Sequence, residues 1–199
     1  MKKRIRKSTE ERKNEIVAAA LKLAGDIGPD RMTTEALARE VGISHACVFR
    51  HFRNKGAIWK AVGEYIGKLL AVKTKFPDLS LDRPVDRLRD SVIAHLTFIE
   101  ATPAIPAILF SRELHSENDK LRAFFEGLIV SRHQYFSDLI AAEIGAGRFR
   151  SDIDPEDAAY LILCLVQGLA MRWSLNARRF HLADEGRRLL DLQLDGFKP

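Results

Sequence analysis

The sequence lacks two features on which many proteins depend: cysteine pairs and long apolar runs. Cys47 and Cys164 are its two cysteines, and they form neither a disulfide framework nor a metal-ligand spacing, which favours a reducing cytoplasm and no metal or cofactor. The longest near-continuous apolar stretch, Ala158–Val166, has nine residues, whereas a membrane-spanning helix needs about 20. The basic N-terminus is followed by polar residues rather than by the apolar run of a signal peptide. We therefore expect neither secretion nor a membrane partner.

The motifs of the common enzyme classes are also missing from the sequence. There is no glycine-rich phosphate loop, no metal-binding His/Glu helix motif and no Gly-x-Ser-x-Gly elbow. A dyad of Cys164 with His95 or His133 would require the fold to bring them together by accident. We therefore expect no enzymatic activity.

Positive charge is concentrated in the first 60 residues, which contain 14 Lys and Arg against 7 Asp and Glu; the remaining residues contain 18 and 20. Such an asymmetry is typical of a chain that meets a polyanion at one end. The first residues form a basic arm, which either follows phosphates or is merely a solvated tail. Its charges are Lys2, Lys3, Arg4, Arg6 and Lys7.

Almost every segment has apolar residues at three- and four-residue steps, and Gly and Pro mark the ends of these segments. The pattern predicts an all-α fold with nine helices and no internal repeat, low-complexity tract or long linker. The expected helices cover about 8–27, 33–41, 44–52, 54–77, 82–101, a short stretch ending near 115, 119–144, 155–176 and 183–195.

The segment TEALAREVGISHACVFRHF, residues 34–52, meets the requirements for two helices that cross through a tight turn. Ala38 is small where the helices touch, and Gly42 is free to take a positive φ in the turn. Together with the basic N-terminus, the segment predicts a helix-turn-helix that binds double-stranded DNA. Its apolar anchors are Leu37, Val41, Ile43, Val48 and Phe52.

The stretch from about Arg12 to Val62 resembles the TetR family of bacterial transcriptional regulators, through MTTEALAREVGIS, FRHF and the Asn and Lys of RNKGAIWKAV. The nine-helix layout extends the resemblance to the whole chain. The resemblance implies a homodimer with a DNA-binding domain over 1–54 and an effector-binding and dimerisation domain over 55–199. It further implies a repressor that a small-molecule effector releases from a pseudo-palindromic operator, with the helix at 54–77 as the lever.

The start of the second helix of the motif is expected to face base edges. His45, Ala46 and Arg50 lie there, and arginine is the commonest bidentate reader of guanine. Lys55 lies where the helix dipole disfavours a cation, so a phosphate shared with His51 would offset that cost.

Hydroxyls and free N–H groups at helix N-termini suit phosphates. Phe49 stands where the family usually has a tyrosine, and Cys47 where it often has a hydroxyl; Cys47 is alternatively a redox-sensitive thiol. The whole predicted DNA-binding set is Thr33, Thr34, Ser44, His45, Ala46, Cys47, Phe49, Arg50, His51 and Lys55.

The aromatic side chains of the second part either fill a core or line a cavity, and the sequence leaves both open. His95, His133, Cys164 and Gln167 lie on largely apolar helices, where each needs a partner, a water or a ligand. The family resemblance implies a mostly apolar effector cavity. Its candidate lining residues are Phe98, Phe110, Phe125 and Tyr160.

The helix at 155–176 is apolar nearly all round, so all its sides must be covered. We expect one face to meet the core of its own chain and the other to meet a second copy, which would place two recognition helices about 34 Å apart. The predicted interface consists of Leu161, Leu165, Gly168, Leu169, Trp173, Leu189 and Leu190.

A second function shares every N-terminal feature: a TetR-like DNA-binding factor without an effector, acting in chromosome organisation or cell division. A filled second domain would favour this alternative. An apolar cavity with a few inward polar groups would favour the effector-responsive repressor.

Overall fold

The computed structural model describes residues 7–73 and 83–199, without the side chain of Lys73, and this part of the chain consists of helices, turns and loops. The all-α prediction is confirmed there. The helices are α1 (Thr9–Ile27), α2 (Thr34–Val41), α3 (His45–His51), α4 (Lys55–Lys73), α5 (Pro84–Ala101), α6 (Ala104–Leu109), α7 (Arg112–Glu117), α8 (Asp119–Gly145), α9 (Pro155–Leu175) and α10 (Leu182–Asp195).

Three predictions concern residues outside the described ranges. They are the course of the basic arm before Lys7, the end of the fourth helix at 74–77, and the start of the fifth helix at Asp82. Within the described ranges, α4 reaches Lys73 and α5 begins at Pro84.

The described residues form ten helices rather than nine, because the short helix predicted before residue 115 is two helices. α6 ends at Leu109, and the backbone at Ser111 is extended, with φ −75° and ψ 103°. Ser111 then begins a new helix, since its hydroxyl accepts a hydrogen bond from the Leu114 N–H at 3.0 Å. A capping serine inside an apolar stretch thus divides what the spacing alone predicts as one element.

The predicted helix starts of the N-terminal region are confirmed. Ser8 and Glu11 form a capping box at α1. The Thr33 hydroxyl accepts from the Ala36 N–H at 3.1 Å, and the Asn54 side chain accepts from the Ala57 N–H at 2.8 Å. Gly42 ends α2 in the left-handed region at φ 71°, where a side chain would be strained.

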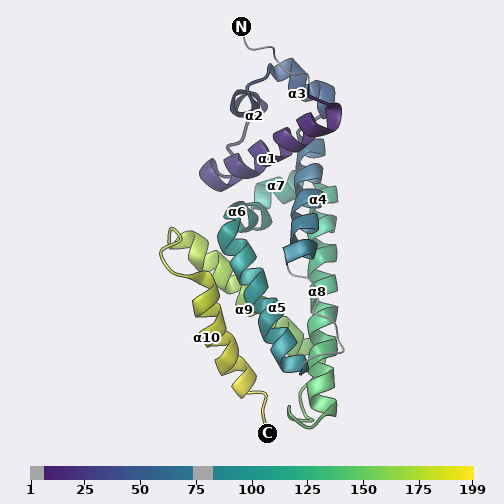
Figure 1. Cartoon of the computed structure of the whole chain (residues 1–199), viewed down its shortest axis with the longest axis vertical. Helices are drawn as coiled ribbons and strands as arrows, with labels where there is room; N and C mark the ends of the chain where they lie inside the picture. Colours follow the sequence, from purple (N-terminus) through teal and green to yellow (C-terminus); the bar gives the residue numbers. More distant parts are fainter. Residues whose placement is uncertain (1–6, 74–82) are drawn as a thin grey trace.

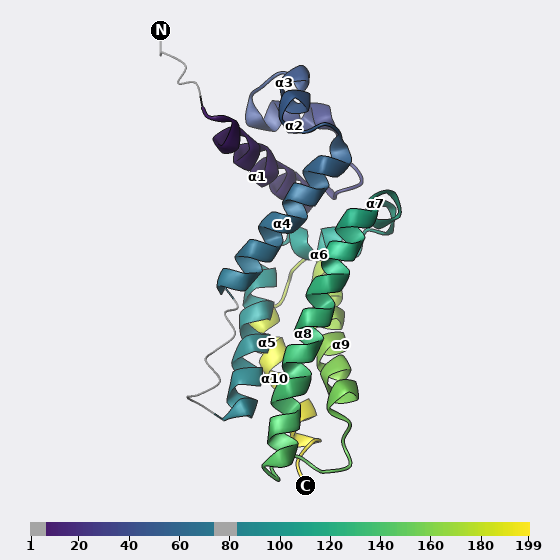
Figure 2. The same cartoon turned by 90° about the vertical axis from the view of Figure 1, so that its right-hand side faces the viewer.

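The molecule is elongated, with α1, α2 and α3 gathered at one end (Figure 1). α4 begins in this head and runs into the body, where α5, α8, α9 and α10 lie along the long axis (Figure 2). α6 packs against α1 and α9, and α7 against α8, so these short helices lie at the joint between head and body. α4 and α6 are therefore among the elements that join the body to the head.

α9 is a core helix of the body. By length and composition, its residues Pro155–Leu175 are apolar enough to cross a membrane, which the length of the uninterrupted apolar runs does not predict. Of the apolar part of this helix, 44% is buried in the fold. α9 packs against α5, α6, α8 and α10. These contacts cover several sides of α9 and explain most of its apolar character.

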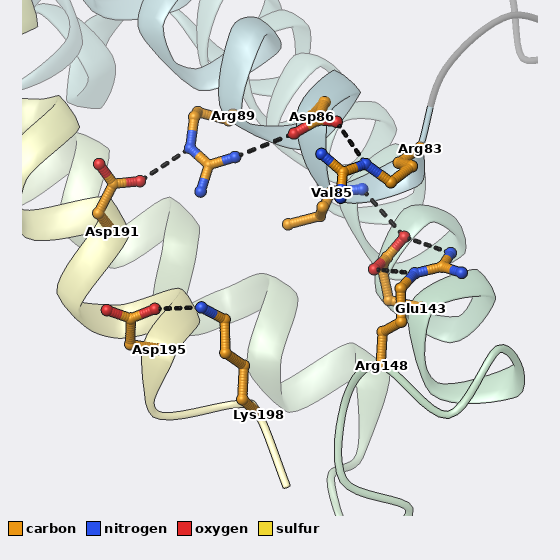
Figure 3. Close-up of polar contacts among 9 residues, drawn as sticks. All are labelled: Arg83, Val85, Asp86, Arg89, Glu143, Arg148, Asp191, Asp195 and Lys198. Atoms are coloured by element: carbon orange, nitrogen blue, oxygen red, sulfur yellow. Dashed lines mark hydrogen bonds and ion pairs between the residues drawn. The ribbon is translucent and has the colours of Figure 1, made fainter.

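A polar network fastens the end of the body that lies farthest from the head (Figure 3). Glu143, only 1% exposed, accepts the Val85 N–H at 3.1 Å and two hydrogen bonds of 2.8 Å from Arg148. The Glu143 carboxylate thereby joins the first turn of α5 to the last turn of α8 and to the loop that follows it. Because Val85 lies among the first four residues of α5, its N–H has no partner within the helix and needs this acceptor.

α5 and α10 approach closely on the other side of the body. The Arg89 guanidinium donates to Asp191 at 2.8 Å across the two helices (Figure 3). Above this pair, a Cβ on Gly186 would collide with the Leu96 side chain, so a glycine is required there. The close approach buries Leu96 completely and holds α10 against the body.

Candidate DNA-binding surface and internal cavity

The predicted residues on α3 lie together on the outer side of the head. Val48 and Phe52 point into the core and are buried, as the helix-turn-helix pattern predicts. Ala46, Phe49 and Arg50 are exposed on the opposite side of the helix. In Figure 1, α3 lies at the tip of the molecule, where a DNA groove has access to it.

The hydroxyl groups at the helix starts already act as caps. The Ser44 hydroxyl accepts a hydrogen bond from the Cys47 N–H at 3.3 Å, and the Thr33 hydroxyl caps α2 in the same way. A hydroxyl that accepts such a bond still has its own proton to donate. Thr33 and Ser44 are both exposed, so this proton can be offered to a phosphate.

His45 does not extend freely from the head. Its Nε2 lies 2.8 Å from Thr34 Oγ1 and 3.2 Å from a carboxylate oxygen of Glu35. The edge of its ring contacts Phe49, with ring centroids 4.8 Å apart at 82°. The predicted base reader is therefore held by the start of α2 and by the aromatic residue one turn further along α3.

A cluster of cations surrounds His51. Burial lowers the pKa of the His51 imidazole, and the charges of Arg50, Arg12 and Lys13 lower it further. Arg12 and Lys13 belong to α1 and are absent from the predicted DNA-binding set. Two sequence features identify them as candidates: they follow directly after the basic arm, and they belong to the first 60 residues, which carry the excess of positive charge. The cluster makes the α1–α3 side of the head positively charged.

Lys55 lies at the edge of a groove between the head and the body. The groove, of about 220 Å³, is also lined by Asp30, Glu113 and Glu117. Lys55 therefore has carboxylates nearby as well as the start of α4, and its sharing of a phosphate with His51 stays a prediction. Cys47 is half-buried in α3 with its N–H committed to the Ser44 cap.

A cavity of about 70 Å³ lies in the body between α4, α5, α6, α8 and α9. Phe98, Phe110 and Phe125 line it, as predicted, among mainly aliphatic neighbours. Tyr160 does not: it is 54% exposed and stacks on His133 on the outer side of α9, with ring centroids 3.9 Å apart. Tyr160 is removed from the predicted lining, because its position on α9 turns it away from the body.

Three polar side chains reach this apolar cavity: His95 from α5, Arg132 from α8 and Gln167 from α9. His95 and Gln167 are two of the four polar residues that the sequence places on apolar helices. The other two, His133 and Cys164, lie elsewhere: His133 contacts Tyr160 and the Glu156 carbonyl, and Cys164 is exposed on α9.

The predicted dimer interface divides into two groups. Leu161 and Gly168 are exposed, and Leu165 and Leu189 are partly exposed, so these four remain available to a second copy. The others are buried in the core of the single chain and are corrected to core residues: Leu169, Trp173 and Leu190.

Trp173 points inward because its Nε1–H donates to the Phe180 carbonyl of the α9–α10 loop at 3.0 Å. The prediction omitted two strongly exposed leucines, Leu175 at the end of α9 and Leu192 on α10. Leu175 lies on the same stripe of α9 as Leu161 and Gly168, and Leu192 lies one turn after Leu189 on α10. We call Leu161, Cys164, Gly168, Leu175, Leu189 and Leu192 the outer apolar face.

Residues 16–62 match the family model described as "Bacterial regulatory proteins, tetR family". The match covers α1 from Ile16 onward, α2, α3 and the first part of α4, which carry most of the candidate DNA-binding surface. Over 173 residues the chain is 26% identical to the nucleoid occlusion factor SlmA of Haemophilus influenzae (strain PittGG), covering 84% of this chain and 78% of that protein.

Solved structures share the whole fold. A TetR transcription regulator from Haloarcula marismortui has a TM-score of 0.80 at 19% identity, over 96% of this chain and 100% of that chain. A transcriptional regulator from Saccharomonospora viridis in complex with choline has a TM-score of 0.79 at 20% identity, over 94% and 96%. These similarities concern the head and the body together.

Proposed function

Because this chain belongs to the TetR family of DNA-binding regulators, we propose that it is a homodimeric repressor that a small molecule releases from its operator. The head binds the pseudo-palindromic DNA site, the outer apolar face joins two copies, and the cavity holds the effector. The observation that carries the proposal is the apolar cavity with three polar groups in its wall, because a protein that only binds DNA needs no such space.

DNA binding rests on the exposed side of α3. Arg50 supplies a guanidinium for guanine, and Ala46 offers a surface small enough to let α3 approach base edges. The exposed hydroxyls at the starts of α2 and α3 and the cations of α1 hold the phosphates on either side. Lys55 acts at the start of α4, and the basic arm extends the phosphate contacts.

Dimerisation rests on the outer apolar face. Exposed leucines gathered on one face are unfavourable in water, and a second copy related by a two-fold axis would bury them. Leu161 lies on the outer side of α9 while the opposite side of the same helix forms the core, so both helix faces become covered in the dimer. Two heads then contact the same side of a duplex, about one helical turn apart.

The cavity is coupled to the head through two helices. Ile66 and Leu70 of α4 line the cavity, and the same helix begins in the head. Ile105 and Leu109 of α6 also line it, and α6 packs against α1 at Gly25, where Ala104 lies in contact. An effector that displaces α4 and α6 moves the heads relative to each other. In this proposal α4, the helix that the family resemblance gives as the lever, acts together with α6.

The direct test is operator affinity, measured by fluorescence anisotropy, with and without small molecules from a library of apolar compounds and organic acids. We expect at least one compound to weaken operator binding about tenfold or more, as for a typical allosteric coupling. The variant Val166→Phe, which fills the cavity from α9, should retain operator binding and lose the response. Equal affinities for every compound that binds the protein would exclude the coupling.

The relatives named SlmA favour a second function, a DNA-binding factor in chromosome organisation or division. Such a factor would occupy many sites across the chromosome without changing transcription of neighbouring genes. A genome-wide map of the DNA sites that the protein occupies in cells, combined with transcript levels after deletion of its gene, separates the two functions. Few promoter sites with derepressed genes support the repressor, and dispersed sites with unchanged transcripts support the alternative.

A further inference from the structure

Resting on the proposed function, in which a small molecule occupies the cavity, we propose that this molecule is a short monocarboxylic acid. Its carboxylate lies against Arg132 and His95, and its short aliphatic body lies toward α6. The cavity is apolar at one end and polar at the other, so it distinguishes the two ends of such a molecule.

The polar end is defined by the order of residues along two neighbouring helices. His95 is the first residue of α5 that lines the cavity, and Arg132 is the last residue of α8 that does so. α5 rises toward α6 while α8 descends away from α7, so the two helices run in opposite directions (Figure 2). His95 and Arg132 therefore share the end of the cavity that is remote from the head.

Arg132 is a buried cation with a fixed guanidinium. Its Nη1 donates to Ser91 Oγ at 2.9 Å, and the guanidinium carbon lies 5.8 Å from the centre of the Phe136 ring. Removal from water lowers the pKa of Arg132, because burial disfavours the charged form. Arg132 places this guanidinium in the cavity wall, and the planar donors of a guanidinium match the two oxygens of a carboxylate.

His95 supplies a neutral hydrogen-bond donor beside this charge. Burial and the charge of Arg132 lower the pKa of the imidazole to about 3, so the ring carries one N–H and one free nitrogen at neutral pH. Its Nδ1 is buried and makes no hydrogen bond within the described residues. A ligand oxygen or hydroxyl at this end satisfies a group that the folded chain leaves without a partner.

The rest of the cavity selects an apolar body of limited size. Phe98, Ile105, Leu109 and Phe110 provide apolar walls toward α6. A volume of about 70 Å³, at about 10–15 Å³ for each water-sized group, accommodates about five to seven such groups. A short aliphatic acid fits this space, whereas the Arg132 charge repels an amine.

Isothermal titration of the full chain without DNA tests the proposal. The probes are pentanoate and butanoate, their neutral amides, and pentylamine as the cation of matched length. We expect both acids to bind at least about tenfold more tightly than their amides, because a carboxylate gains the charged hydrogen bonds to Arg132. Pentylamine should not bind.

Variants assign the difference to the cavity. Arg132→Gln should remove the preference for acid over amide, and Arg132→Lys, which keeps the charge and loses the planar donors, should retain part of it. Arg89→Gln removes a half-buried arginine of α5 outside the cavity and is the matched control. Val166→Phe should abolish binding of acids and amides alike, which excludes adsorption of acids to the basic surface.

Acid-selective binding that Arg132→Gln removes and Arg89→Gln preserves supports the proposal. Equal binding of acids and amides, or tighter binding of pentylamine, overturns it, even if Arg132→Gln does not fold, because this comparison needs only the wild-type chain. The proposed function is judged separately by operator release. If acids bind but do not release DNA, the proposed repressor function is wrong and the proposed ligand stands. If only neutral compounds release DNA, the proposed ligand is wrong and the repressor function stands.

Discussion

His45 Nε2 lies 2.8 Å from Thr34 Oγ1, so the first residue of α3 is joined to the first residue of α2. The two residues begin the two helices of the helix-turn-helix, and Glu35 lies within 3.2 Å of the same nitrogen. The ring of a predicted base reader is thereby fixed before DNA arrives. A fixed side chain loses less conformational freedom on binding than a mobile one, which favours recognition of one base pair.

The first prediction concerns this pair. His45→Ala should reduce discrimination at one base pair of each half-site by about 1–3 kcal/mol. Thr34→Val should have a smaller effect of the same sign, since it only releases the ring. Competition binding with operators substituted one base pair at a time measures both effects. Arg187→Ala, an exposed arginine of α10, is the control; unchanged discrimination in His45→Ala would remove His45 from the base readers.

The second prediction concerns the pH dependence of DNA binding. Burial and the neighbouring cations lower the pKa of His51 in the free protein. A phosphate beside the ring would raise that pKa, so binding would take up protons and affinity would rise as the pH falls. The maximum slope is about tenfold per pH unit and protomer. Anisotropy at constant ionic strength between pH 5.5 and 7.5 measures it.

His51→Gln should flatten this pH profile, while His45→Gln, which removes a neighbouring imidazole, should leave it. An affinity that falls with decreasing pH in the wild type would show that no phosphate approaches His51. Loss of the profile in His45→Gln instead would assign the proton uptake to His45.

The third prediction concerns His95 and stability. Because the pKa of His95 is lowered to about 3 in the fold and is about 6.5 in the unfolded chain, the unfolded chain binds the extra proton between these values. The stability that neutral His95 contributes is thus present above pH 6.5 and is lost as the pH falls toward 3. Between pH 7 and pH 5 the loss is about 2 kcal/mol.

Urea unfolding of the wild type and of His95→Leu at both pH values checks this. The variant should be less sensitive to pH, since leucine has no proton to bind, and the difference between the two slopes isolates the imidazole from the surface carboxylates. Parallel pH profiles would show that His95 is solvated in solution.

The fourth prediction concerns Glu143. Glu143→Gln keeps an acceptor for the Val85 N–H but removes the charge from the paired bonds to Arg148. The free energy of unfolding should fall by about 1–3 kcal/mol, because a buried hydrogen-bonded charge is lost. Asp152→Asn, an acid-to-amide change in an exposed pair with Arg150, should leave the urea midpoint unchanged.

The fifth prediction concerns the outer apolar face. Leu161→Glu should convert a dimer into a monomer, since a carboxylate would be buried against its symmetry copy. Val72→Glu, on an exposed valine of α4 outside the outer apolar face, is the control and should stay dimeric. Light scattering at micromolar concentration distinguishes the states. A monomeric wild type would exclude this face as the interface.

Local patterns predicted the head well and the body only in outline. The head depends on caps and a left-handed glycine, and Ser8, Thr33, Ser44 and Gly42 act in the structure as their spacing indicates. These features are decided within a few residues of sequence, so no tertiary information is needed to locate them.

The body required information that a single helix does not contain. Leu169, Trp173 and Leu190 are as apolar as the exposed Leu161, and only packing decides which of them reach a second copy. Tyr160 lies outside the cavity for the same reason. Arg132 was missed because an arginine on an amphipathic helix is normally solvated, and its burial depends on Ser91, 41 residues away in sequence.

The central claim is that the head reads duplex DNA, and in vitro selection from a random duplex pool with the full chain tests it most directly. The account predicts enrichment of an inverted repeat with half-sites about one helical turn apart, bound less tightly as salt rises. Retention of no duplex at low ionic strength, or retention without any common sequence, would contradict it.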